Sequence, residues 1–167
     1  MAENARDRAA RLIARGNPGG LLYGAIITGA VMSATANHAP TTARVVVAAV
    51  FVLGIYWLAD VYVRAFADQF HHGRSPLPRR LLAAARHESR VLVGGVPAIA
   101  VVAVASLLGA GTALAVSLAL WLTAVELGAV GYLAARYVGA DRRAAVGESL
   151  AAALLGLLMV LAKTFLH

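Results

Sequence analysis

Three long uncharged segments constrain this chain more than any other feature. They run from Asn17 to Ala43, from Val91 to Val125 and from Ser149 to Ala162. A helix needs about 20 apolar residues to cross about 30 Å of hydrocarbon, since each residue adds roughly 1.5 Å. Only 14% of the residues are charged, whereas a soluble domain carries about a quarter. The sequence therefore predicts an all-α, polytopic transmembrane helical bundle.

The apolar runs and the breaks between them predict five spans in one transmembrane domain, residues 19–167. The expected spans cover about residues 20–36, 44–66, 91–108, 113–135 and 144–166. Residues 1–18 precede them as a basic segment that suits an anionic leaflet. The stretch Gly109–Thr112 is so short that it permits only an antiparallel hairpin of the third and fourth spans.

The basic residues predict how the chain is oriented. Alternation through five spans places all of the 15 lysines and arginines on one side except Arg44 and Lys163. Basic loops stay in the cytoplasm, so we expect a cytoplasmic N-terminus and an external C-terminus. This bias also accounts for the net charge of +7, and we expect no nucleic-acid partner.

The first span has a second interpretation. Arginines, an apolar run and the small residues Ala34-Thr35-Ala36 also fit a secretory signal peptide. Cleavage there would leave four spans in the same orientation. We expect the span to be retained.

Small residues recur every four positions in the first span. Gly20 and Gly24 form one such pair, and Gly29 and Ser33 form another on a neighbouring face. Small residues at this spacing let membrane helices approach closely. They predict either a homo-oligomer interface or packing within one chain, and we favour the second.

Charged residues within the apolar spans predict a polar site in the inner half of the membrane. Asp60 and Arg64 share one helix face with Asp68, so Arg64 can pair with either carboxylate. Glu126 lies roughly 15 Å from the end of its span, where an unpaired carboxylate costs at least a few kcal/mol. We expect the site to consist of Asp60, Arg64, Glu126 and Glu148.

Each of these residues also has a plain structural explanation. Asp60 and Asp68 can belong to the wet end of a helix. A protonated Glu126 can bond to Thr123, Ser106 or Ser117. Glu148 suits the positive N-terminus of the fifth span.

The segment between the second and third spans is rich in arginine and histidine. Its arginines are expected to bind anionic lipid headgroups or a partner; they are Arg74, Arg79, Arg80, Arg86 and Arg90. Asp68, His71 and His72 are weak metal-ligand candidates, because Gly73 and Pro76 indicate that the helix ends there. We therefore expect no metal site.

Familiar enzyme motifs are absent from the sequence. It contains no cysteine, which excludes thiol chemistry. It also lacks the Gly-x-Ser-x-Gly, His-Glu-x-x-His and P-loop patterns. We expect no cofactor and no enzymatic activity, and an intramembrane enzyme using Glu126 or Asp60 as a base is the least favoured hypothesis.

Three stretches give the chain its one resemblance: the apolar run that begins at Arg44, the stretch from Tyr56 to Tyr62 and the run from Leu154 to Lys163. It resembles small integral membrane proteins of high-GC bacteria. The resemblance implies five spans and a plasma-membrane location, and it implies no activity.

Two functional hypotheses follow. The first is a small channel or transporter-like protein that passes protons or a small ion past Asp60, Arg64 and Glu126. The second is an accessory or scaffold protein that binds lipid or a partner through its arginine-rich cytoplasmic face.

Overall fold

The computed structural model describes residues 18–36, 38–71 and 76–165, and within them the fold is all-helical with no strand. The five helices are α2 (Pro18–Thr35), α3 (Thr42–His71), α4 (Leu77–Leu107), α5 (Thr112–Tyr137) and α6 (Arg142–Phe165). The basic N-terminal segment predicted for residues 1–18 lies almost wholly outside the described residues. Its last residue, Pro18, opens α2.

Four of the helices, α3 to α6, are long and apolar enough to cross a membrane, which makes this a multi-pass membrane protein. The remaining helix, α2, has 18 residues, or about 27 Å, slightly less than the hydrocarbon thickness. The prediction of five apolar helices is confirmed. The number of membrane crossings and their orientation remain predictions.

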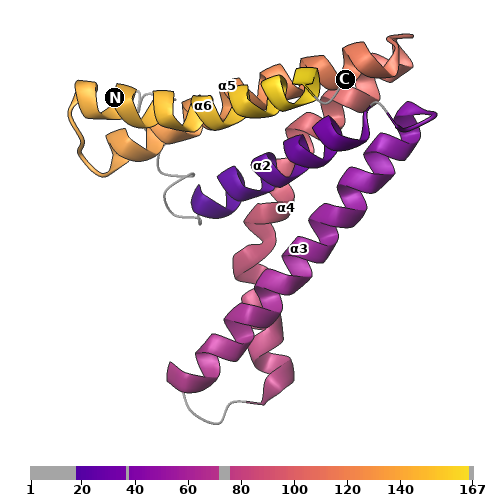
Figure 1. Cartoon of the computed structure of the whole chain (residues 1–167). Coiled ribbons are helices and arrows are strands. Elements are labelled where there is room, and N and C mark those ends of the chain that lie inside the picture. The colour runs from indigo at the N-terminus through magenta and orange to yellow at the C-terminus, as the bar shows by residue number, and fades with distance from the viewer. Residues whose placement is uncertain (1–17, 37, 72–75, 166–167) are drawn as a thin grey trace, which may run out of the picture.

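The predicted segment between the second and third spans is mostly helical, which corrects the sequence-based expectation. Helix α3 continues to His71 and α4 already begins at Leu77. The reason is local. Strong helix formers such as Leu81 and Ala84 follow Pro78, and a proline is tolerated in the first turn of a helix. The two helices therefore run on as a hairpin beyond their most apolar stretches (Figure 1).

Two turns of the same design join the last three helices. Gly109 after α4 and Gly139 after α5 have φ angles of 85° and 84°. In each turn the residue after the glycine donates its N–H to a carbonyl five residues earlier, as Ala110 does to Ala105. This is a Schellman motif, which glycine permits because it has no side chain to clash. Helix α6 then starts at a cap in which the Ala144 N–H donates to Asp141 Oδ1 at 2.7 Å.

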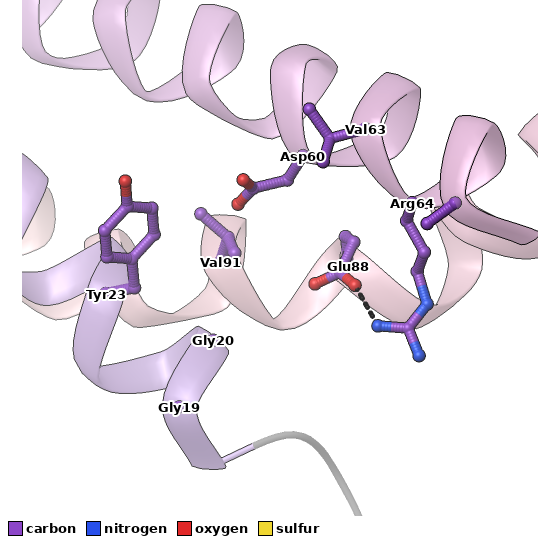
Figure 2. A pocket seen from close by; sticks show the side chains of 9 residues that line it. Gly19, Gly20, Tyr23, Asp60, Val63, Arg64, Glu88 and Val91 are labelled. Carbon is purple, nitrogen blue, oxygen red and sulfur yellow. Dashed lines mark hydrogen bonds and ion pairs between the residues drawn. The ribbon is translucent and has the colours of Figure 1, made fainter.

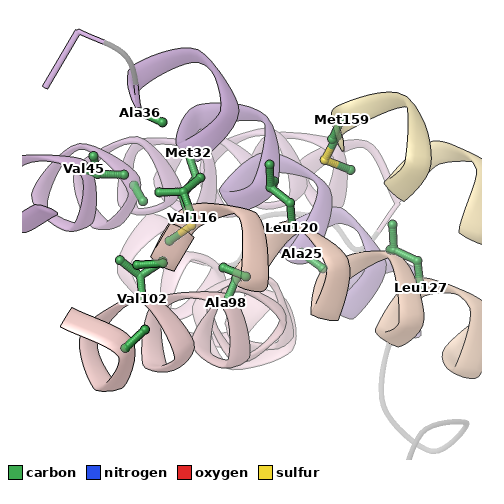
Figure 3. Close-up of a cluster of buried hydrophobic side chains, with 14 residues drawn as sticks. Ala25, Met32, Ala36, Val45, Ala98, Val102, Val116, Leu120, Leu127 and Met159 are labelled. Atoms are coloured by element: carbon green, nitrogen blue, oxygen red, sulfur yellow. The ribbon is translucent and has the colours of Figure 1, made fainter. Parts of the chain in front are cut away.

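Helix α2 is the central element, because it contacts all four other helices. Figure 1 shows α5 and α6 running side by side, with α2 next to them and α3 and α4 meeting in a hairpin at the far end. The core is built from small and medium side chains (Figure 3), among which Ala25, Met32, Val102 and Leu120 are almost fully buried. Helix α2 has apolar residues on every side, which is typical of a helix that is surrounded by other helices.

Glycines bring the backbones together at two crossings. A methyl group at Gly24 of α2 would overlap the Val91 carbonyl oxygen of α4, and one at Gly94 would overlap the Leu21 carbonyl oxygen of α2. In the same way, a methyl group at Gly156 would overlap the backbone of α5. Apolar attraction does not distinguish helix from lipid inside a membrane, so close van der Waals contact of this kind stabilises the bundle.

Candidate functional site

A pocket of about 460 Å³ lies where the start of α2, the last third of α3 and the first half of α4 meet. Figure 2 shows Tyr23, Asp60 and Glu88 around it, one from each of these helices. The pocket is lined by Gly19, Gly20, Tyr23, Asp60, Val63, Arg64, Ala67, Glu88 and Val91. Charged side chains and apolar walls come together in this pocket.

An ion pair closes one end of the pocket. Arg64 Nη1 donates to Glu88 Oε1 at 2.6 Å. The Glu88 side chain is only 8% exposed, whereas the Arg64 side chain is 42% exposed. The sequence-based interpretation gave Arg64 a partner on its own helix, either Asp60 or Asp68. The structure gives it Glu88 of α4, because the helical extension of α4 brings that residue alongside α3.

Asp60 occupies the other side of the pocket. Its carboxylate points from α3 into the space beside Tyr23 (Figure 2). Among the residues that the structure describes, no hydrogen bond or ion pair reaches this carboxylate. Since Arg64 is engaged by Glu88, no cation among the described lining residues is left to pair with Asp60.

Glu126 does not line this pocket. It lies on α5, partly buried, and its Oε2 atom is buried without a hydrogen-bond partner. Of the partners suggested by the sequence, Thr123 donates to the Ala119 carbonyl at 2.9 Å and Ser117 donates to the Ala113 carbonyl at 2.8 Å. Both hydroxyl groups donate their proton within α5, so they do not donate to Glu126.

Glu148 is exposed on α6 and is also absent from the pocket. Helix α6 begins at Arg142, and its first turn is capped by Asp141. Glu148 thus lies beyond the turn where the helix dipole favours a carboxylate. The structure therefore brings together only Asp60 and Arg64 of the four predicted site residues.

Lys163, near the end of α6, is a buried cation. It is 8% exposed. Its Nζ atom donates to the Ala113 carbonyl at 2.8 Å and to the Ser117 hydroxyl. These bonds hold the end of α6 against the start of α5.

The arginines of the α3–α4 hairpin fall into two groups. Arg80 is structural, since its Nη1 donates to the Ala65 carbonyl at 3.1 Å and to Gln69 Oε1 at 3.3 Å. Arg79 and Arg86 are exposed, and Arg90 is partly buried. Arg74 lies outside the described residues. Exposed arginines are therefore present on α4, as the lipid-binding hypothesis requires.

The small residues of α2 make contacts within the chain. Gly24 packs on α4, and Gly29 faces the Met159 side chain of α6. The Ser33 hydroxyl donates to the Met159 carbonyl at 3.1 Å. Gly20 is buried beside the pocket. These contacts correspond to the interpretation of packing within one chain.

The weak metal candidates are described only in part. Asp68 is partly exposed, the His71 side chain is not described, and His72 lies outside the described residues. Among residues 18–36, 38–71 and 76–165, no three His, Asp or Glu side chains are grouped so that they could hold a metal ion.

These features define the class of the protein as a multi-pass helical membrane protein with a charged pocket between three of its helices. No protein-family model, no curated protein and no solved structure matches the chain. The function therefore has to be argued from the pocket itself.

Proposed function

We propose that this chain is a small transport-class protein of a bacterial plasma membrane, which binds a proton or a small cation at Asp60. The observation that carries the proposal is the Asp60 carboxylate, which faces a pocket and has no partner in the described part of the chain. An ionisable group among apolar helices is costly to maintain, so it indicates a functional site by default.

In this proposal the three charged residues of the pocket have separate roles. Glu88 compensates the charge of Arg64, which leaves Asp60 as the group that takes up the cation. The basic residues favour a cytoplasmic N-terminus. In that orientation the start of α2, and with it the pocket, opens toward the cytoplasm.

Glu126 is proposed as a second carboxylate on the route. Its Oε2 atom is buried without a partner, and it lies more than halfway along α5. A carboxylate in that environment favours the neutral form unless water or a cation reaches it.

The test is a flux measurement in proteoliposomes under a proton gradient and, separately, a sodium or potassium gradient. We expect flux in the wild type and a loss of at least tenfold in Asp60→Asn and in Glu126→Gln. The matched control is Asp141→Asn, which removes an exposed carboxylate but keeps a good helix cap. Absence of flux in the folded wild type for all three ions would refute passage of protons or small inorganic ions.

A second candidate function is supported by the exposed face of the α3–α4 hairpin. Tyr62, Phe66 and Phe70 follow one another along α3 with ring centroids 6.4 Å and 5.3 Å apart. All three are more than half exposed, and Arg79 and Arg86 are exposed on the neighbouring helix. Aromatic rings with arginines suit the headgroup region of an anionic leaflet.

This alternative is an accessory protein whose hairpin binds anionic lipid. It predicts that replacing Arg79 and Arg86 by Gln lowers the amount of anionic lipid retained on purification, measured by mass spectrometry. Arg44→Gln, at the start of α3, is the control because Arg44 is equally exposed but distant in the chain from the hairpin. Equal retention in all variants would count against it.

A further inference from the structure

The charge balance of the pocket selects a cation as its ligand. Among the described residues that line the pocket, the charged groups are two carboxylates, Asp60 and Glu88, and one guanidinium, Arg64. The 2.6 Å pair between Arg64 and Glu88 accounts for one charge of each sign. A ligand that neutralises the remaining carboxylate carries a single positive charge.

The walls of the pocket do not suit a bare inorganic ion. Such an ion exchanges its hydration shell for about six oxygen ligands. Of the described residues in the lining, Tyr23 alone adds a side-chain oxygen, its hydroxyl, to those of the two carboxylates. Val63, Ala67 and Val91 supply apolar surface instead.

Tyr23 adds a fixed aromatic ring next to the carboxylate. Its ring packs edge-on against Tyr56 of α3, with centroids 6.0 Å apart and planes at 80°. This contact holds the ring beside the pocket, where Figure 2 shows it facing the same space as Asp60. An aromatic ring attracts a cation through its quadrupole, most strongly when the cation is poorly hydrated.

The size of the pocket agrees with a small organic molecule. Its volume of about 460 Å³ falls within the range of about 300–1,000 Å³ found for small-molecule sites. One water occupies about 30 Å³, so a proton or a single inorganic ion would leave most of this space unused.

We infer that the pocket binds an amphipathic organic ammonium ion, with its cationic group between Asp60 and Tyr23 and its apolar body against Val63, Ala67 and Val91. The inference rests on the proposed function, in which Asp60 is the cation site, and it names the class of substrate. Arg64 and Glu88 border the site and set its net charge.

The test uses benzyltrimethylammonium as the probe and its uncharged isostere, neopentylbenzene, as the comparison. Isothermal titration of the detergent-solubilised full chain should show binding of the ammonium at least tenfold tighter than binding of the isostere. Asp60→Asn should weaken binding of the ammonium by about tenfold or more, because it removes the counter-charge. Asp141→Asn should leave the affinity within twofold.

The aromatic contact has its own pair of variants. Tyr23→Phe keeps the ring and should bind within about threefold of the wild type, whereas Tyr23→Leu should bind about five- to tenfold more weakly. Equal weakening by both substitutions would show that the ring is not the recognition element and would overturn this part of the inference.

A measurement on the unmodified chain covers the case in which a variant does not fold. Reaction of the Asp60 carboxyl with a carbodiimide, followed by mass spectrometry, should slow at least fivefold when the ammonium is present. Sodium or potassium at the same concentration should give no protection. Protection by the inorganic ions alone would overturn the inference.

The outcomes separate this inference from the proposed function. Proton or sodium flux that depends on Asp60, without ammonium binding, would overturn the inference and leave the transport proposal in place. Ammonium binding that depends on Asp60, without flux of any cation including the probe, would support the inference and refute transport.

Discussion

Gly24 of α2 lies against the backbone of α4 so closely that any side-chain carbon at this position would overlap the Val91 carbonyl oxygen. The contact is reciprocal, since Gly94, three residues after Val91, lies against Leu21 of α2 in the same way. The crossing therefore depends on two glycines on opposite helices.

Gly24→Ala should destabilise the fold by about 2–3 kcal/mol, because the two backbones must separate to admit a methyl group. Gly54→Ala is the matched control, since a methyl group there meets nothing within 4 Å. It should stabilise α3 by up to about 1 kcal/mol, because alanine is the better helix former. Unfolding by sodium dodecyl sulfate in mixed micelles, followed by circular dichroism, measures both. A loss of stability in both variants would contradict this account of the crossing.

The Arg64–Glu88 pair should respond unequally to removal of its two members. Arg64→Met leaves the Glu88 carboxylate, which is 8% exposed, with one cation fewer and should cost about 2–3 kcal/mol. Glu88→Gln frees a guanidinium that is 42% exposed and can reach water or headgroups, so it should cost at most about 1 kcal/mol. The same micelle unfolding experiment, with the double variant added, measures the coupling. Equal losses of stability in the two single variants would show that the difference in burial between Glu88 and Arg64 is unimportant.

Glu126→Leu should raise stability by about 1–3 kcal/mol, since it removes an acidic group whose Oε2 is buried without a partner. Glu148→Leu, at an exposed position of α6, should change stability by less than about 0.5 kcal/mol. Unfolding midpoints of the two variants are compared with that of the wild type. A destabilised Glu126→Leu would mean that the carboxylate has a structural role.

The orientation can be tested directly because the native chain has no cysteine. Leu108 and Val138 are exposed residues at the two tight turns, on either side of α5. In intact cells a membrane-impermeant maleimide should label Leu108→Cys, and it should label Val138→Cys only after the cells are opened. Labelling of both in intact cells, or of Val138→Cys alone, would contradict the predicted orientation.

The apolar runs and the breaks between them were sufficient to predict the number and approximate positions of the helices. The two-glycine turn at Gly109 was equally predictable, because the sequence leaves no room for anything longer. The extensions of α3 and α4 were missed because hydropathy marks where lipid begins, and a helix does not have to end there. Leu81, Ala84 and their neighbours favour helix, but their apolar run covers only residues 81–85 and is too short to mark a span.

The composition of the site was harder to predict than the fold. Spacing along α3 correctly placed Asp60 and Arg64 on one face. It could not identify Glu88 as the partner of Arg64, since this depends on how α3 and α4 pack against each other. The predicted depth in the membrane also grouped Glu126 with Asp60. A position along a helix specifies that depth, but it does not specify the direction in which the side chain points. A hint was present in Glu88 itself, an acidic residue among the arginines of a helix-forming stretch.

The position of α2 has a consequence for biosynthesis. It is the first of the described helices to leave the ribosome, yet each of its four neighbours is made later. Its bond from Ser33 to Met159 joins residues 126 positions apart, so it forms only when nearly the whole chain has been translated. Until then the surface of α2 that α6 later covers faces lipid or the insertion machinery, and closure of α6 onto α2 is a late step of assembly.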